Sequence, residues 1–493
     1  MNKKAIFILT ILAVMALPVG AMAAAEFTLG GYIKMEISWD STSTNKNLTA
    51  PILRNNDWNF HHGRLKFTAN STRFNLTIKG PKLWGAETTG FIETDFDSGG
   101  NSLIPGQDTL SGGNTFRMRH AMFRLNWPET ELLLGQYWGY FSEFTPETAH
   151  DSGCQFMGSP TQRLPQVRLT QKFLGAWTAS VLIGMPFNSA QDTATFVTFP
   201  GAAVPVVQTN PTPGEHAESP QVQAKFGFEQ DLWGKAAFYG RPRGFAAQLA
   251  AGWQRSQFRA GQIVGRTFFQ DQFAAPVFTA QRDSQILDHW IVMGSMFVPI
   301  IPTSSPNLAG TMSLSTQWYV GAGLNAFGEG QDANSTYLKF QSPGTTLFPG
   351  FFFLATPDLY DRYLMKQYGG FIQMQYYFTN EWFINAVWGM SKVFGVPQGT
   401  NPTAVDPFGN VEGRTYLATA DQFKMLQQYN LTLWYRPIQA LKFGLQYSYM
   451  RTDWLQKGDM SVNSLFAPFP RFGNKTSDVG EDHRVMFAGF FYF

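Results

Sequence analysis

The sequence HRVMFAGFFYF, residues 483–493, decides the fold because its residue types alternate with a period of two. One parity holds Val485, Phe487, Gly489, Phe491 and Phe493, and the other holds Arg484, Met486, Phe490 and Tyr492. An extended strand places these sets on opposite faces, whereas a helix would scatter them around its axis. A strand of roughly ten residues with an apolar outer face is the repeating unit of a transmembrane β-barrel.

The composition of the 493-residue chain suits that interpretation. It has 16% aromatic residues, 47 Gly and 46 Phe, yet its mean hydropathy is only −0.17. After the amino terminus no run reaches the roughly 18 apolar residues that cross a bilayer as a helix. A barrel explains both facts, because alternation hides the lipid-facing residues from hydropathy averages.

The amino terminus has the pattern of a secretory signal peptide. A basic start is followed by an apolar run over 5–17 and by the small residues Ala-Met-Ala at 21–23. We expect residues 1–23 to be removed, with cleavage possible as late as Ala25, which leaves 24–493 as a single exported β-barrel domain. A membrane anchor helix is the alternative, but the apolar run is too short to span a bilayer.

The same alternation predicts about sixteen strands along the chain. They cover residues 27–40, 73–79, 88–96, 116–127, 131–141, 164–173, 176–187, 221–230, 245–258, 286–298, 311–323, 369–378, 382–390, 427–436, 441–450 and 483–493. Residues 58–69 fit either a part of the second strand or a folded loop.

The connections support a barrel in the outer membrane. Seven are short, eight are long and polar, and the two kinds alternate, as periplasmic turns and extracellular loops do. Tryptophans that suit an interfacial girdle stand beside the short turns, namely Trp84, Trp127, Trp177, Trp233, Trp382 and Trp434. A soluble β-sandwich or propeller predicts neither feature. We therefore predict an all-β fold, a transmembrane antiparallel barrel closed between its first and last strands.

The interior of such a barrel is too wide for side chains to fill, so an aqueous channel is expected. Alternation assigns to its wall the basic residues Lys34, Arg73, Lys79, Arg117, Arg119, Arg168, Lys172, Lys225, Lys442 and Arg484. It assigns to the same wall the acidic residues Glu36, Glu93, Asp95 and Glu229. These charges have two interpretations. They could form a cationic wall that concentrates small anions, in which Arg117 and Arg119 point the same way and form a ladder, or they could pair with one another across strands.

One long connection, residues 139–163, is a candidate constriction of the channel. It carries Glu143, Glu147 and Asp151 among prolines and aromatic residues. If it folds inward it narrows the pore, and if it is an ordinary extracellular loop it leaves the pore open. The residue types alone favour the external loop.

Other classes of function lack their usual sequence features. Of the 37 Lys and Arg, two belong to the signal peptide, which leaves 35 against 35 Asp and Glu and no basic excess for binding nucleic acid. Cys154, the only cysteine, excludes an internal disulfide and a C-x-x-C-H haem site. His61, His62 and His150 have no metal-binding spacing, so we predict no metal, no cofactor and no enzyme activity. A hydrolase assembled from separate strands and a sheath for a partner cytochrome are the alternatives.

Three consecutive motifs lie in the first third of the chain. They consist of Glu93, Asp95 and Phe96, then Arg117, Arg119, His120 and Ala121, then Leu133, Leu134, Gly135, Gln136 and Trp138. In this order they resemble the DcaP-like outer-membrane porins and, more distantly, the phosphate-selective porin O and P group. The resemblance implies a homotrimer of sixteen-stranded pores, a third loop folded into each channel, and a preference for small anionic solutes such as dicarboxylates. It shifts the expectation for residues 139–163 towards a constriction.

One departure from the family concerns the amino terminus. Members with an amino-terminal coiled coil have heptads before the barrel, whereas here Phe27 begins the first strand directly after the signal peptide. Trimer contacts would then have to come from the barrel walls.

These observations lead us to expect a porin in the outer membrane of a Gram-negative bacterium, in contact with outer-membrane lipid. It would conduct small anionic or polar solutes by passive diffusion. A substrate-specific channel with a saturable site on the arginine wall is the alternative. We expect Phe493 to be the terminal signal that the barrel-assembly machinery recognises during biogenesis.

Overall fold

The structure is a computed structural model. It describes residues 25–42, 62–96, 116–150, 158–186, 217–258, 285–328, 358–395, 423–454 and 479–493, with isolated residues and short strands between these ranges. Strands dominate, and the other elements are the short 3₁₀ helices η1 (Tyr140–Ser142) and η2 (Leu324–Phe327). Within the described ranges no helix is long and apolar enough to cross a membrane.

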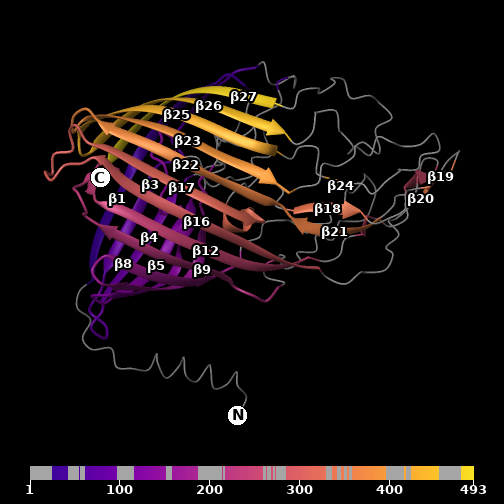
Figure 1. Ribbon diagram of the computed structural model, residues 1–493, viewed down its shortest axis with the longest axis horizontal. Helices are drawn as coiled ribbons and strands as arrows, with labels where there is room; N and C mark the ends of the chain where they lie inside the picture. Colours follow the sequence, from indigo (N-terminus) through magenta and orange to yellow (C-terminus); the bar gives the residue numbers. More distant parts are fainter. Residues whose placement is uncertain are drawn as a thin grey trace, which may run out of the picture.

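One closed antiparallel sheet forms a barrel of tilted strands (Figure 1). Its strands are β1 (Glu26–Asp40), β2 (Arg64–Thr68), β3 (Arg73–Lys79), β4 (Glu87–Asp95), β5 (Arg117–Asn126), β6 (Thr130–Trp138), β7 (Arg163–Phe173), β8 (Trp177–Gly184), β9 (Gln221–Gln230), β12 (Phe245–Phe258), β16 (Gln285–Ile301), β17 (Met312–Ala322), β22 (Lys366–Tyr377), β23 (Trp382–Phe394), β25 (Phe423–Ile438), β26 (Leu441–Trp454) and β27 (Val479–Tyr492). The predicted fold class is confirmed.

The sheet has 17 elements but sixteen wall positions, because β2 and β3 share one position. Both pair with β1, β2 along its later part and β3 along its earlier part. A polar turn separates them, in which the Thr72 amide donates to the Ala69 carbonyl at 3.0 Å. Residues 64–68 of the segment left open above are therefore strand, and residues 58–61 lie outside the described part.

The last strand closes the barrel, as predicted. β27 pairs with β26 over Leu441–Asp453 on one side and with β1 over Tyr32–Asp40 on the other. From the sequence, the whole of the first strand from Phe27 to Trp39 was expected to pair with the last one, but the observed pairing begins only at Tyr32. A barrel closes only with a stagger between its strands, so the start of β1 extends past the end of β27.

The outer face changes character along the last strands. Near the short turns the outward residues are the stacked aromatics Trp382, Tyr435 and Phe443. Aliphatic residues follow, among them Ile384, Leu433 and Leu445. Towards the long connections comes a second set, which we call the loop-end aromatic set, made of Trp388, Tyr429, Tyr449 and His483. An apolar band between aromatic girdles is typical of a lipid-facing barrel wall.

One of the predicted girdle tryptophans faces the other way. Trp84, Trp233 and Trp382 are exposed on the outside, but Trp434 is fully buried. It pairs with Phe383 on the inner parity, and the Lys442 ammonium lies 3.8 Å from its ring centroid. The prediction was wrong for Trp434, because a position beside a turn does not by itself decide which face a side chain takes.

A small hairpin lies between β9 and β12. It consists of β10 (Ala236–Phe238) and β11 (Arg241–Arg243), where the sequence predicted only a short turn. Positive φ angles at Tyr239 and Gly240, of 50° and 75°, form its tight turn. A turn with positive φ at both central residues usually has Asn-Gly or Asp-Gly there, so the Tyr-Gly pair gave the sequence-based prediction no hairpin signal.

Further short strands lie outside the barrel wall. They are β13 (Gln262–Ile263), β14 (Phe268–Phe269), β15 (Gln272–Phe273), β18 (Thr336–Phe340), β19 (Thr346–Phe348), β20 (Phe352–Leu354), β21 (Asp358–Leu364) and β24 (Tyr416–Leu417). β13, β21, β18 and β24 form one small sheet within the long connections.

Candidate functional site

The inner face of the barrel carries the residues that alternation assigned to it. Strand register places Lys34, Arg73, Lys79, Glu93, Asp95, Arg117, Arg168 and Lys172 on this face. On β1 the contrast is clear, since Lys34 and Glu36 are buried while Ile33 and Met35 are exposed outside. Lys79 lies at the turn end of β3, where its ammonium is 3.3 Å from Glu26.

Arg117 and Arg119 belong to a charge network rather than to a free ladder. Arg117 donates to both oxygens of Asp95, at 2.8 and 2.7 Å. Arg119 donates to Glu93 and to Asp95, each at 2.7 Å. Arg73 lies 3.8 Å from Glu93. The three arginines thus share two carboxylates, and the network has a net positive charge.

A β-bulge explains how Arg119 enters this network. The register between β4 and β5 shifts at Glu93 and Thr94, so that Asp95 faces Arg117 and Glu93 faces His120. Arg119 is the extra residue of the bulge. A bulge re-aims a side chain, and here both arginines reach the same acidic pair.

Arg168 on β7 differs from these arginines because its partners are neutral. Its Nε donates to Gln166 at 3.1 Å and its Nη2 donates to the Trp138 carbonyl. Its guanidinium also lies 4.7 Å from the centroid of the Tyr140 ring. Among the described residues it forms no ion pair with a carboxylate, so its charge is not neutralised there.

The described parts of the candidate constriction segment, residues 139–150 and 158–162, lie inside the barrel. Its backbone amides donate to side-chain oxygens on three separate strands: Tyr140 to Gln223 at 3.0 Å, Glu147 to Gln373 at 2.7 Å and Ala149 to Gln446 at 2.7 Å. These glutamines belong to β9, β22 and β26. A segment that bonds strands so far apart in the sheet must cross the interior, so it narrows the lumen.

The acidic residues of this segment hold it against the wall. Glu147 pairs with Lys442 of β26 and accepts a hydrogen bond from Gln375 at 2.8 Å. The Glu147 carbonyl accepts another from Asn385 at 2.9 Å. Glu143 lies 2.6 Å from Lys225 of β9. Asp151, the third candidate, is outside the described residues, as is Cys154.

Aromatic packing fixes the start of the segment. Tyr140 and Phe141 are fully buried, and burial raises the pKa of Tyr140 to about 12, so its hydroxyl stays protonated. Phe141 packs edge to face on Phe327 of η2, with centroids 5.6 Å apart. Gly252 makes room for both rings, since a Cβ there would lie 2.9 Å from each. The start of the connection after β17, Leu324–Phe327, thus also folds inward, which the sequence did not indicate.

The hairpin β10–β11 meets the segment from the opposite end of the barrel. The Tyr239 hydroxyl donates to the Thr145 carbonyl at 2.6 Å. The Arg243 guanidinium stacks 4.8 Å from the Phe144 ring centroid and 4.6 Å from that of Phe238. The hairpin is joined to the wall where Ser313 donates to the Ala237 carbonyl at 2.9 Å. The constriction is therefore built from both ends of the barrel.

The candidate enzyme residues are not brought together. Among the described residues no three His, Cys, Asp or Glu side chains are placed to hold a metal ion. His150 is buried beside the constriction, His62 lies before β2, and His61 is outside the described part.

The backbone as a whole is similar to solved outer-membrane proteins. The outer membrane channel DcaP of Acinetobacter baumannii matches with a TM-score of 0.56 at 16% identity, over 96% of this chain and 99% of that one. Salmonella typhi OmpF matches with a TM-score of 0.46 at 10% identity, over 96% and 100% of the two chains. Pseudomonas putida OprB matches with a TM-score of 0.45 at 10% identity, over 95% and 94%.

These likenesses concern the fold. The predicted resemblance to DcaP-like porins is confirmed at that level, because DcaP and this chain share the barrel over nearly their full lengths. No protein-family model matches the chain, and no curated protein matches it in sequence.

Proposed function

We propose that the chain is a porin that lets small hydrophilic solutes, preferably small anions such as dicarboxylates, diffuse across the outer membrane of a Gram-negative bacterium. The observation that carries the proposal is a closed barrel with a segment of its own chain anchored across its interior. An anchored segment narrows a wide channel but does not close it, as a separate plug domain would. The solved channel with this fold supports the same conclusion.

The placement in the membrane rests on the outer face and the amino terminus. An apolar band between aromatic girdles suits a bilayer. Residues 1–23 are proposed to be the export signal, and 24–493 the barrel domain; the signal lies outside the described residues. No enzyme activity and no cofactor are part of the proposal.

The anion preference rests on the wall formed by β3 to β9. Its inward basic residues are Arg73, Lys79, Arg117, Arg119, Arg124, Arg168, Lys172 and Lys225. Its carboxylates are fewer, and those of Glu93 and Asp95 are shared among three arginines. A lumen with a positive excess concentrates small anions and repels cations.

Reversal potentials in planar bilayers with a salt gradient test this preference. The wild type is expected to be anion-selective, and Arg73→Gln/Arg117→Gln to shift the potential towards zero. Arg119 still bonds Glu93 and Asp95 in that variant, so neither carboxylate is left unpaired. Arg255→Gln is the control, because Arg255 bonds Asp288 at 2.9 Å on the outer face. A cation-selective wild type, or equal shifts in both variants, would refute the preference.

A saturable binding site on the same wall is the second candidate. Arg168 supports it, because a guanidinium whose described partners are neutral can still take a carboxylate ligand. Succinate that blocks single-channel current with a saturating dependence on concentration would favour a specific site. A current that scales linearly with succinate concentration would favour a general pore.

Assembly is proposed to follow the pattern of such barrels. The exposed apolar walls, including Met118 and Phe123 of β5, suit contacts between copies in a homotrimer, which light scattering of the detergent-solubilised protein tests. The Phe493 amide donates to the Gly31 carbonyl at 3.3 Å, and its ring is exposed for recognition by the barrel-assembly machinery. Deleting Phe493 is expected to lower the amount of folded, heat-modifiable barrel in outer membranes. Unchanged levels would remove that role.

A further inference from the structure

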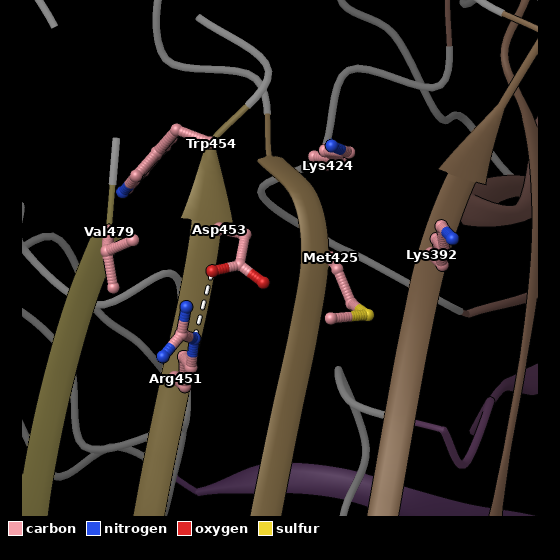
Figure 2. A pocket seen from close by; sticks show the side chains of 7 residues that line it. All are labelled: Lys392, Lys424, Met425, Arg451, Asp453, Trp454 and Val479. Atoms are coloured by element: carbon pink, nitrogen blue, oxygen red, sulfur yellow. Dashed lines mark hydrogen bonds and ion pairs between the residues drawn. The ribbon is translucent and has the colours of Figure 1, made fainter. Parts of the chain in front are cut away.

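A cavity of about 350 Å³ opens at the loop end of the last strands (Figure 2). It is lined by Lys392, Lys424, Met425, Arg451, Asp453, Trp454 and Val479. These residues come from β23, β25, β26 and β27 and lie where the strands end. The cavity is separate from the constriction and its anchors.

The cavity belongs to the outer surface of the barrel. Lys392, Met425, Asp453 and Val479 are successive partners in one register row across the four strands. Their parity is that of the exposed residues Tyr429 and Leu431 of β25, and opposite to that of the buried Leu426 and Trp434. Solutes inside the lumen therefore cannot reach this row, whereas molecules around the barrel can.

Its position relative to the lipid-facing band is defined on each strand. Below the cavity comes the loop-end aromatic set, and then the aliphatic part of the wall. The rings of that set follow one another across the strands, with Tyr429 and Tyr449 centroids 6.1 Å apart. Interfacial aromatics mark the level of the lipid headgroups, so the cavity lies at that level or just above it.

The charges in the cavity favour an anion. Arg451 bonds Asp453 at 2.9 Å and lies 3.3 Å from Glu481, so the arginine forms ion pairs with both carboxylates. Lys392 and Lys424 have no ion pair with any carboxylate in the described ranges. Lys424 is displaced from the regular row by the register shift between Phe423 and Met425. Two lysines and one arginine thus line the cavity, together with the Asp453 carboxylate that Arg451 bonds (Figure 2).

We propose that this cavity binds the phosphate of a phosphorylated lipid in the outer leaflet, with Lys392 and Lys424 as its ligands. The acyl chains of such a lipid would lie along the aliphatic wall below, between the aromatic girdles. Ammonium groups at headgroup level attract anionic lipid, and the cavity supplies space for a phosphoryl group that a flat wall lacks. The inference rests on the proposed membrane placement but not on conduction.

Binding of bis-phosphorylated lipid A to the purified full-length protein in non-ionic detergent tests the proposal by native mass spectrometry. Each surface lysine near anionic lipid strengthens binding about five- to sixfold, and the two contributions multiply. Lys392→Gln/Lys424→Gln is therefore expected to weaken binding about thirtyfold. Dephosphorylated lipid A is expected to bind wild type and variant equally. Lys235→Gln/Arg255→Gln, which removes two cations elsewhere, is the matched control and should bind like the wild type.

Three outcomes would overturn the proposal. They are an unchanged affinity in Lys392→Gln/Lys424→Gln, an equal loss in the control variant, and displacement of the lipid by inorganic phosphate at equal concentration. The last would mean a site for free anions instead of lipid. Heat-modifiable migration on gels checks that each variant is folded, and unchanged single-channel conductance separates failure of this site from failure of the channel function.

Discussion

The two halves of the barrel interior are both charged, but they differ in how far water reaches the charges. On β1 and β27, the side chains of Lys34, Asp40 and Arg484 are at most 2% exposed, and that of Lys442 on the neighbouring β26 is 11% exposed. On β3, β5 and β9, those of Arg73, Arg117 and Lys225 are 18%, 31% and 15% exposed, although Arg119 of β5 is only 8% exposed. We call the first the packed wall and the second the accessible wall. Under the proposed function, charge on the inner face would therefore serve two purposes, which are to anchor the constriction segment and to meet solutes.

The anchoring half is explained by the constriction segment. Glu147 reaches the packed wall and is 5% exposed, with Lys442 as its ion-pair partner. A buried charge is tolerated only when it is paired and hydrogen-bonded, and Glu147 satisfies both conditions. On the accessible half, Arg73 and Arg117 are also paired with carboxylates, but part of each side chain remains open to water.

The largest expected effect is the loss of the anchor in Glu147→Gln. It leaves the Lys442 ammonium without its carboxylate, which costs about 3–5 kcal/mol of unfolding free energy for a buried pair. Release of the segment should also raise single-channel conductance. Urea unfolding in phospholipid vesicles and bilayer recordings measure the two effects.

Glu143→Gln is the matched control for that experiment. Glu143 pairs with Lys225 on the accessible wall and its side chain is 29% exposed, so its loss should cost under about 1 kcal/mol. Equal losses in the two variants would mean that the walls do not differ in the way proposed.

The sequence predicted the strands and the inner parity because both follow from a local period of two. It named Glu147 as a constriction candidate but did not predict its ion pair with Lys442. The two residues are 295 positions apart in the sequence, and no short pattern links them. For the same reason, the sequence left residues 139–163 with two interpretations until the family resemblance was considered. Trp434 shows that a place beside a turn is a weaker guide than alternation, because Trp434 shares the inner parity of Asn430 and Thr432.

The second effect separates stability from selectivity. Arg484→Gln removes a cation of the packed wall that pairs with Asp40, and Arg64 at 3.1 Å remains as a second partner of that carboxylate. We expect a loss of about 2–3 kcal/mol with an unchanged reversal potential. Arg117→Gln on the accessible wall should do the reverse, with a smaller loss and a shifted potential. A shift of equal size in Arg484→Gln would show that solutes reach both walls.

A third, smaller effect concerns the space between the segment and the wall. In Gly252→Val the new side chain would meet the Phe141 and Phe327 rings, which stand 2.9 Å from a Cβ at that position. Overpacking of this kind costs about 1–3 kcal/mol and should displace η1. The expected readout is a noisier, larger current. Gly294→Val is the control, because a Cβ there meets no atom within 4 Å, and a similar change in its current would argue against this packing role.

The smallest effect tests whether the hairpin β10–β11 steadies the accessible side of the constriction. Tyr239→Phe removes the hydroxyl that donates to the Thr145 carbonyl at 2.6 Å but keeps the ring that packs on Phe238. The same hydroxyl lies 3.0 Å from Thr145 Oγ1, and because both hydrogen bonds are exposed, each contributes at most about 0.5–1.5 kcal/mol and unfolding should change little. Current noise should nevertheless rise, because Thr145 lies between the anchors Glu143 and Glu147 and would lose both hydrogen bonds to the hairpin. Tyr435→Phe on the outer face is the control. If the current noise of both variants equals that of the wild type, the hairpin only packs against the segment. Glu147 would then be the residue that holds the constriction in place.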